Sequence, residues 1–268
     1  MLWVFILVVL ILGFWWRAYR LFRSRSPGAP FVVGHRGAAA SAPENTLAGL
    51  REGRRQLAFW LEVDVRRTAD DELVLLHDAT LDRTTNGSGC IELSTWADVQ
   101  QLDAGSWFAA AFAGEPVPRL EAALRYAVAE DVKLVVEVKE PARYPGIGRQ
   151  LTELIETCAA ASHVVVISFA GDWLARFKAR TPGLETGALY GPSDRVPTKT
   201  RHEYVDVHWR RVLGDPTLVF RLHRRQRRVF VYTVDRVWLM VLLGWLGVDG
   251  ITSNRPGSWP GRSKQEPR

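Results

Sequence analysis

The stretch FWLEVDV, residues 59–65, places Glu62 and Asp64 inside a run of apolar and aromatic residues. Alternate side chains of a β-strand point to the same face, so these two carboxylates share one face of the predicted strand. The sequence LVVEVK repeats the spacing with Glu137 and Lys139. Because an unpaired buried charge costs several kcal/mol, charged side chains in apolar strands indicate a site that requires them.

Short runs rich in β-branched residues alternate with helical stretches along the rest of the chain. They predict strands at Phe31–Gly34, Phe59–Val65, Leu73–Leu76, Lys133–Val138, Val164–Ser168, Thr186–Tyr190, Tyr204–His208, Arg228–Val234 and Gly250–Thr252. The intervening stretches predict helices at Thr46–Leu57, Arg119–Glu130, Ile147–Ala161, Asp172–Ala179, Pro216–Arg227 and Arg236–Gly247. Strands separated by helices of this length indicate βαβ units and a parallel sheet.

About eight such units in 268 residues favour an α/β fold of the closed (β/α)8 TIM-barrel type over an open sheet. Nine strands are one too many, and the gap between Val65 and Leu73 is too short for a crossover helix. We therefore expect an irregular barrel there, with one strand outside it. Residues 79–118 hold no long apolar period and predict a small insertion over the active site.

Two further polar pairs end predicted strands. His35 and Arg36 end FVVGHRG, and His77 with Asp78 ends LVLLHD. Each charged group of the chain's apolar strands thus falls at a carboxyl end, which is the catalytic face of a TIM barrel. Two histidines can supply the proton transfers of a hydrolysis, one accepting from the attacking oxygen and one donating to the leaving oxygen.

Three converging carboxylates, from Glu62, Asp64 and Glu137, with no cysteine among them describe a site of oxygen ligands. Such ligands suit one divalent cation, Mg²⁺ or Ca²⁺. Arg36 and Lys139 beside it would hold an anion such as a phosphate diester. Together with the two histidines, these residues form a complete set for phosphodiester cleavage.

Each residue also has a purely structural interpretation, which the sequence leaves open. A single histidine at a strand end is often only a hydrogen-bonded structural residue. Glu137 and Lys139 could pair with each other, and Glu62 could pair with Arg66 or Arg67 at the barrel rim. The coincidence of several polar clusters at strand ends nevertheless favours a site.

The polar clusters lie in segments that resemble the glycerophosphodiester phosphodiesterase family. These are HRGAAASAPENT (35–46), LEVDVRRTADDELVLLHDATLDRTTNGSG (61–89), LDAGSW (102–107), PVPRLEAAL (116–124), VEVKEP (136–141), VYTVD (231–235) and GVDGITSNRP (247–256). The order HRG, PENT, E-x-D and H-D is highly specific, although any one of these motifs alone would be weak. The resemblance covers about residues 31–256.

The resemblance implies a TIM barrel with a small insertion after the H-D motif. It implies that Glu62, Asp64 and Glu137 bind the cation, that Arg36 and Lys139 hold phosphate, and that His35 and His77 act as general base and acid. It places Glu44 and Asn45 near the site, where they order the first loop. Tyr232 would line the substrate pocket at a position where the family usually has Trp, and Asn254 stands where it often has Asp.

The primary functional hypothesis is hydrolysis of glycerophosphodiesters to an alcohol and glycerol 3-phosphate. The first alternative is a lysophospholipase D that takes lysophospholipids from a membrane. A non-catalytic barrel that binds phosphate or lipid head groups is a second alternative, for which the loss of a histidine or a carboxylate would be the mark. A metal-dependent isomerase or aldolase barrel lacks support, because the chain has paired histidines and no second base lysine.

The first segment predicts a transmembrane anchor over residues 1–23, followed by a linker over residues 24–30. Met1–Trp16 carries no charged side chain, and four arginines follow, at Arg17, Arg20, Arg23 and Arg25. Positive charges after the apolar run predict a single-pass membrane protein with its catalytic domain in the cytoplasm. The barrel is predicted over residues 31–257 and a disordered tail over residues 258–268.

The net charge and the number of cysteines limit which other classes of protein the sequence can belong to. The net charge is +6 and the pI is near 9.6, yet no nucleic-acid-binding motif accompanies the arginines, so we expect no nucleic acid partner. Cys90 and Cys158 are the only cysteines, which excludes a disulfide framework.

Overall fold

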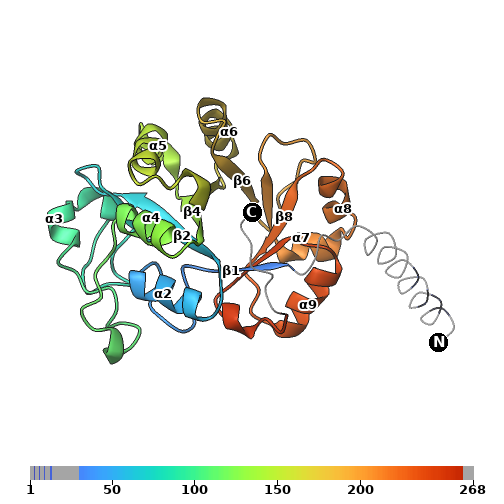
Figure 1. The fold of residues 1–268 in the computed structure, drawn as a ribbon, viewed down its shortest axis with the longest axis horizontal. Helices are drawn as coiled ribbons and strands as arrows, with labels where there is room; N and C mark the ends of the chain where they lie inside the picture. Colours follow the sequence, from blue (N-terminus) through green and yellow to red (C-terminus); the bar gives the residue numbers. More distant parts are fainter. Residues whose placement is uncertain (1–2, 4–5, 7–8, 10–12, 14–29, 262–268) are drawn as a thin grey trace.

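A closed barrel of eight parallel strands forms the centre of the molecule. The computed structural model describes residues 3, 6, 9, 13 and 30–261. The barrel strands are β1 (Phe31–Gly34), β2 (Trp60–Arg67), β4 (Lys133–Val138), β5 (Val164–Ser168), β6 (Glu185–Tyr190), β7 (Tyr204–His208), β8 (Arg228–Tyr232) and β9 (Gly250–Ser253). Pairing of β1 with both β2 and β9 closes the ring, in agreement with the expected (β/α)8 barrel (Figure 1).

The ninth predicted strand lies outside the ring. Strand β3 (Leu73–Leu75) pairs antiparallel with the second half of β2, with Val65 opposite Leu75 and Arg67 opposite Leu73. A tight turn at Thr68–Glu72 joins them, because so short a connection permits only an antiparallel hairpin. The irregularity expected between Val65 and Leu73 is thus a hairpin at the rim of the barrel.

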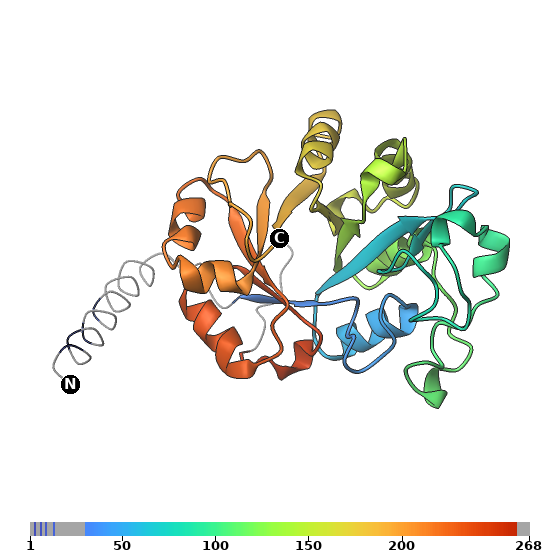
Figure 2. The same ribbon diagram turned by 180° about the vertical axis from the view of Figure 1, so that it is seen from behind.

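Helices cover the outside of the barrel. They are α2 (Leu47–Arg55), α4 (Leu120–Ala129), α5 (Ile147–Thr157), α6 (Gly171–Arg180), α7 (Trp209–Gly214), α8 (Leu218–His223) and α9 (Val237–Trp245). Short 3-10 helices lie at Pro141–Arg143, Ala161–His163 and Pro256–Ser258. Figure 2 shows the same helices from behind, arranged around the strands. The helix predicted at Pro216–Arg227 corresponds to α8 alone, and α7 was not predicted from the sequence.

Alternation along β2 separates the two sides of the barrel wall. Leu61, Val63 and Val65 are fully buried in the layer between strands and helices. Trp60 points inward, where its ring packs at 5.4 Å from Phe230 in the closed lower part of the barrel. The carboxylates of β2 follow Trp60 on this inner side, so the strand delivers them to the barrel mouth.

Residues 79–118 form the insertion after the H-D motif. It contains α3 (Trp96–Val99) and 3-10 helices at Ile91–Leu93 and Ala110–Phe112. A small core of its own holds it against β3, with Leu81, Ile91 and Val99 buried beside Val74. Figure 1 shows the insertion at the opposite end of the molecule from α8.

The predicted membrane anchor is wrong. The segment 1–23 falls almost entirely outside the described residues, and the described part of the chain contains no helix long and apolar enough to cross a membrane. The uncharged run ends at Trp16, whereas a spanning helix needs about 20 apolar residues. The single-pass, cytoplasm-facing localisation depended on this anchor and is wrong with it. The linker at 24–30 and the tail at 258–268 also fall mostly on residues that are not described, and the domain boundaries stay predictions.

Candidate active site

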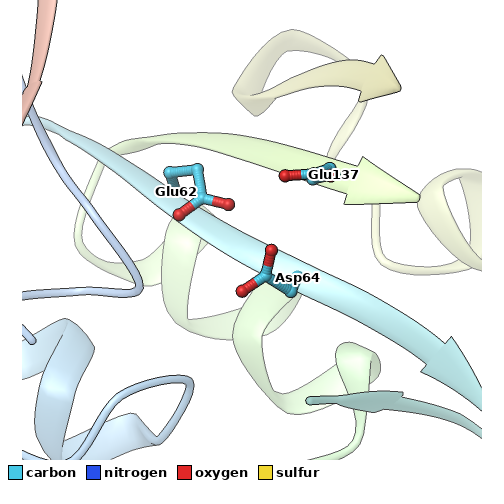
Figure 3. Close-up of side chains that lie close together, drawn as sticks. All are labelled: Glu62, Asp64 and Glu137. Atoms are coloured by element: carbon cyan, nitrogen blue, oxygen red, sulfur yellow. The ribbon is translucent and has the colours of Figure 1, made fainter. Parts of the chain in front are cut away.

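Three carboxylates converge on the inner side of the barrel wall. Glu62 and Asp64 come from β2 and Glu137 comes from the neighbouring β4, where it lies opposite Asp64 in the register. One oxygen from each carboxylate lies within 4.8 Å of the other two, and all three residues are buried. Figure 3 shows the three side chains facing one another across the two strands.

The loop after β1 folds back over this cluster. Gly37 has φ +90° and packs so closely on α2 that a Cβ there would lie 2.4 Å from the carbonyl carbon of Gly49. Arg36 also lies in the left-handed region, at φ 50°. Its backbone N–H thereby donates to Glu62 Oε2 at 2.9 Å. The HRG motif is therefore a turn that places Arg36 against the carboxylates, and only glycine fits its third position.

Asn45 fixes the position of Asp64. Its Nδ2 donates to Asp64 Oδ2 at 2.8 Å, and its Oδ1 accepts from the backbone N–H of Asp64 at 3.0 Å. Both residues are buried, so this paired contact holds the carboxylate rigidly. Asn45 has φ 56°, a conformation that asparagine tolerates better than most residues.

Two cationic side chains balance the carboxylates. Lys139 Nζ lies 2.9 Å from Asp64 Oδ1 and 2.7 Å from Glu137 Oε1. Arg36 Nε lies 3.1 Å from Asp64 Oδ2, while its Nη1 donates to Glu44 Oε1 at 2.6 Å. These contacts leave Arg36 Nη2 without a partner among the described residues.

Burial and neighbouring charges shift the pKa values of the three carboxyl groups in different directions. Burial, Asp64 and Glu137 raise the pKa of Glu62 well above its ordinary value. Burial and Asp64 likewise raise the pKa of Glu137 to about 7, against the pull of Lys139. Burial opposes the ionisation of Asp64 as well, but Lys139 and Arg36 hold its pKa well below the ordinary range. Without a further positive charge, the cluster therefore retains protons at neutral pH.

The donor atoms of this cluster fit a divalent cation. Glu62 Oε1 is buried and accepts no hydrogen bond, and Asp64 Oδ1 has only the ammonium of Lys139 as a partner. Buried polar atoms are rarely left without a partner, and carboxylate oxygens are the ligands that hard cations prefer. A cation held by Glu62, Asp64 and Glu137 would satisfy these oxygens and displace the retained protons.

Two histidines flank the cluster, and each is held through Nδ1. His35 Nδ1 lies 2.7 Å from Asn254 Oδ1, and its Nε2 lies 3.9 Å from Glu62 Oε2. His77 Nδ1 lies 2.6 Å from Asp78 Oδ1. Burial is the main cause that lowers the pKa of both rings. In each case Nε2 is left as the atom that can exchange a proton.

The chain is similar to proteins of known kind. The model of the glycerophosphoryl diester phosphodiesterase family matches residues 35–258. A glycerophosphodiester phosphodiesterase from Caldanaerobacter subterraneus is 34% identical over 228 residues, which are 84% of this chain and 94% of the relative. The chain belongs to the glycerophosphoryl diester phosphodiesterase family.

Solved structures of similar proteins share the barrel. A glycerophosphodiester phosphodiesterase from Agrobacterium tumefaciens is 27% identical, with a TM-score of 0.75 over 86% of this chain and 98% of that one. A phosphodiesterase from Oleispira antarctica is 26% identical, with a TM-score of 0.76 over 90% of this chain and 96% of that one. The latter was solved in complex with the product sn-glycerol-3-phosphate.

For this member of the glycerophosphoryl diester phosphodiesterase family, the structure resolves the pairings that the sequence left open. Glu137 and Lys139 do pair, as the structural interpretation allowed, but Lys139 contacts Asp64 as well. Glu62 pairs with neither neighbouring arginine: Arg66 contacts Glu140, and Arg67 contacts Asp71. Glu62 is thus available to a cation.

Tyr232 is the last residue of β8. Its hydroxyl donates to the backbone carbonyl of Tyr190 at 2.8 Å. Phe169 and His208 pack edge-on against it, with ring centroids 6.1 and 5.9 Å away. Phe169 is half exposed. These three rings form an aromatic wall over β5, β7 and β8, where the family resemblance places the substrate pocket.

Sequence reasoning missed three side chains of the site. Arg83 and Asp235 lie within quoted motifs but follow no strand pattern that would distinguish them. Asp206 is different: it is a carboxyl inside the apolar strand β7, the same signal that singled out Glu62. It is buried, and burial with the nearby Glu137 raises its pKa to about 8. Asp206 therefore carries a proton at neutral pH.

Proposed function

We propose that this protein hydrolyses glycerophosphodiesters to an alcohol and glycerol 3-phosphate, with one Mg²⁺ or Ca²⁺ held by Glu62, Asp64 and Glu137. The observation that carries the proposal is the buried carboxylate cluster on β2 and β4, in which Glu62 Oε1 has no partner and two cationic side chains lie beside the carboxylates. Oxygen ligands alone favour Mg²⁺ or Ca²⁺ over the metals that prefer nitrogen or sulfur.

Charge balance indicates what the site accepts. Three ionised carboxylates, the two cations Arg36 and Lys139, and a divalent ion leave one positive charge. A phosphodiester carries one negative charge and would neutralise it. When bound, the cation would act as a Lewis acid that stabilises charge on the phosphate oxygens. Arg36 Nη2 and the remaining N–H of Lys139 are free to donate to the same phosphate.

His35 is proposed as the general base. Asn254 Nδ2 donates to Asp235 Oδ2 at 2.8 Å, which turns Asn254 Oδ1 toward His35. An amide oxygen only accepts, so His35 Nδ1 carries the proton, and in the neutral ring Nε2 carries the lone pair. Burial lowers the pKa of His35 and so favours the neutral ring, which is oriented to take a proton from the attacking water.

His77 is proposed as the general acid. Its Nδ1 faces the carboxylate of Asp78, and an anionic partner stabilises the protonated ring. In hydrolysis, His35 Nε2 accepts the proton of the attacking water as its oxygen bonds to phosphorus. His77 Nε2 gives its proton to the alcohol oxygen as the old P–O bond breaks. The products are one alcohol and one phosphate monoester.

The alternatives are weakened by the structure. The lysophospholipase D hypothesis rested on a membrane anchor, for which the described residues offer no helix. A non-catalytic binding barrel would have lost a histidine or a carboxylate, yet both histidines and all three carboxylates lie around one site.

The test is to incubate the purified protein with glycerophosphocholine or lysophosphatidylcholine, each with Mg²⁺, with Ca²⁺ and with EDTA. Release of glycerol 3-phosphate, measured with glycerol-3-phosphate dehydrogenase, is expected from glycerophosphocholine only when a divalent cation is present. Turnover of lysophosphatidylcholine alone would favour lysophospholipase D. Full activity in EDTA would exclude the metal from the reaction.

A further inference from the structure

We propose that Arg83, in the insertion, is a positioning residue that joins the two halves of the active site, an inference that rests on the proposed function. Its guanidinium bonds to Asp78 and to Glu44 at the same time. Through Asp78 it fixes His77, and through Glu44 it fixes Arg36. One side chain thus orients both the proposed acid and a proposed phosphate ligand.

The half toward His77 is a bidentate contact. Arg83 Nε donates to Asp78 Oδ2 at 2.6 Å, and Nη2 donates to Asp78 Oδ1 at 3.1 Å. Asp78 Oδ1 in turn lies 2.6 Å from His77 Nδ1. Asp78 is only partly buried, and within the described part of the chain its carboxylate bonds to Arg83 and His77 alone. Without Arg83 it could rotate about its side-chain bonds and release the ring of His77.

The half toward Arg36 uses the other edge of the guanidinium. Arg83 Nη1 donates to Glu44 Oε2 at 2.8 Å, and Nη2 donates to Glu44 Oε1 at 2.8 Å. Glu44 Oε1 also accepts from Arg36 Nη1 at 2.6 Å. Both oxygens of Glu44 are therefore occupied by arginines. Glu44 is a bridge between Arg83 and Arg36 rather than a cation ligand.

Only arginine can make this contact. Four of its N–H bonds point outward from two edges of one plane, so it grips two carboxylates at once. Lysine would present a single ammonium and could not hold both in fixed orientations. The ion pairs themselves are partly exposed and add little to stability. Their value lies in geometry, since a displacement of about 1 Å at a reacting group can cost about 10²-fold in rate.

The leaving group distinguishes positioning of the acid from a general structural role. Choline is a poor leaving group and needs a proton from His77, whereas p-nitrophenol leaves without one. We expect Arg83→Gln to lower kcat for glycerophosphocholine about tenfold or more and to change kcat for a p-nitrophenyl diester much less. KM should rise for both diesters, because Arg36 is freed as well. Arg83→Lys should recover little of the loss.

Arg143→Gln is the matched control. Arg143 also pairs with a carboxylate of the insertion, Glu92, at a similar exposure but away from the histidines. It should leave both kcat values near those of the wild type, and both variants should unfold at similar temperatures. An equal fall in kcat for the two diesters, or wild-type kinetics in Arg83→Gln, would overturn the proposal.

A second measurement does not depend on turnover. The ring of His77, followed by NMR with His77→Ala to assign its signal, should titrate at a lower pH in Arg83→Gln, because a ring released from Asp78 loses the hydrogen bond to the carboxylate that stabilises its protonated form. Arg143→Gln should not shift it. If neither variant moves the titration, Arg83 does not act on His77. If no diester is hydrolysed by the wild type but the titration shifts, the proposed function fails and the coupling stands.

Discussion

His35 Nδ1 and Asn254 Oδ1 lie 2.7 Å apart, whereas the equivalent nitrogen of His77 faces a carboxylate. The amide of Asn254 is fixed in turn by Asp235, which also accepts from the backbone N–H of Asn254 at 2.8 Å. A neutral partner and an anionic partner therefore distinguish two histidines that the sequence alone could not tell apart. This difference gives each ring its proposed role.

Exchanging the partners of His35 tests that role. In the double variant Asn254→Asp/Asp235→Asn, the carboxylate moves next to the ring while the hydrogen bonds between the two positions are kept. The anion should raise the pKa of His35, so the acidic limb of kcat/KM should move to higher pH if His35 is the base. A shift of the alkaline limb instead would make His35 the acid. The single variant Asn254→Ala serves as a control that only loses the orientation of the ring.

Removing either histidine should lower kcat strongly and change the stability of the fold little. His35→Ala and His77→Ala should each lower kcat by about 10²-fold or more, because general acid–base catalysis contributes that much. Circular dichroism and thermal unfolding should change little, since both rings lie at the barrel mouth. A variant with kcat near that of the wild type removes its histidine from the mechanism.

The strands could be predicted because each is short, apolar and bounded by turn residues, and all nine predictions overlap strands of the structure. Which strand lay outside the ring depended on the hairpin at Thr68–Glu72, a tertiary pairing that periodicity does not encode. Glu62 and Glu137 could be predicted because charge in a buried strand is conspicuous. Arg83 and Asp235 could not, because their roles arise from contacts between loops, 39 residues apart for Arg83 and Glu44.

Lys139 should matter most when no cation is present. Its ammonium contacts Asp64 and Glu137, and burial of an uncompensated carboxylate is costly. Lys139→Met should therefore lower the unfolding temperature more in EDTA than in saturating Mg²⁺ or Ca²⁺, where the ion supplies positive charge. It should also weaken substrate binding. An equal fall in unfolding temperature with and without cation would show that the charge of Lys139 does not stabilise the carboxylate cluster.

Cation binding should weaken as pH falls through neutrality. In the cation-free protein the pKa of Glu137 is raised to about 7, and that of Glu62 is raised as well. Below about pH 7 an incoming cation must displace protons, so its apparent affinity should fall by up to about tenfold per pH unit for each proton released. Isothermal titration in two buffers of different ionisation enthalpy should show proton release near pH 7 and less release at pH 8.5. Identical heats in the two buffers at pH 7 would contradict the raised pKa values.

The free energy of unfolding of the cation-free protein should fall as pH rises toward neutrality, whereas the affinity for the cation should rise. The folded protein holds the Glu137 proton to about pH 7, while the unfolded chain releases it near its ordinary value of 4.5. The stabilisation associated with this proton is complete below about pH 4.5 and is lost as pH rises to about 7, a change of about 3 kcal/mol. Glu137→Gln cannot titrate, so in EDTA its free energy of unfolding should fall less between pH 5 and 7.5 than that of the wild type. At pH 7.5 a saturating cation should restore the free energy of unfolding of the wild type but not that of Glu137→Gln, because the cation binds an ionised carboxylate and the variant has none at this position. Parallel curves for the two proteins in EDTA would show that Glu137 is already ionised and that the cluster needs no cation to hold it so.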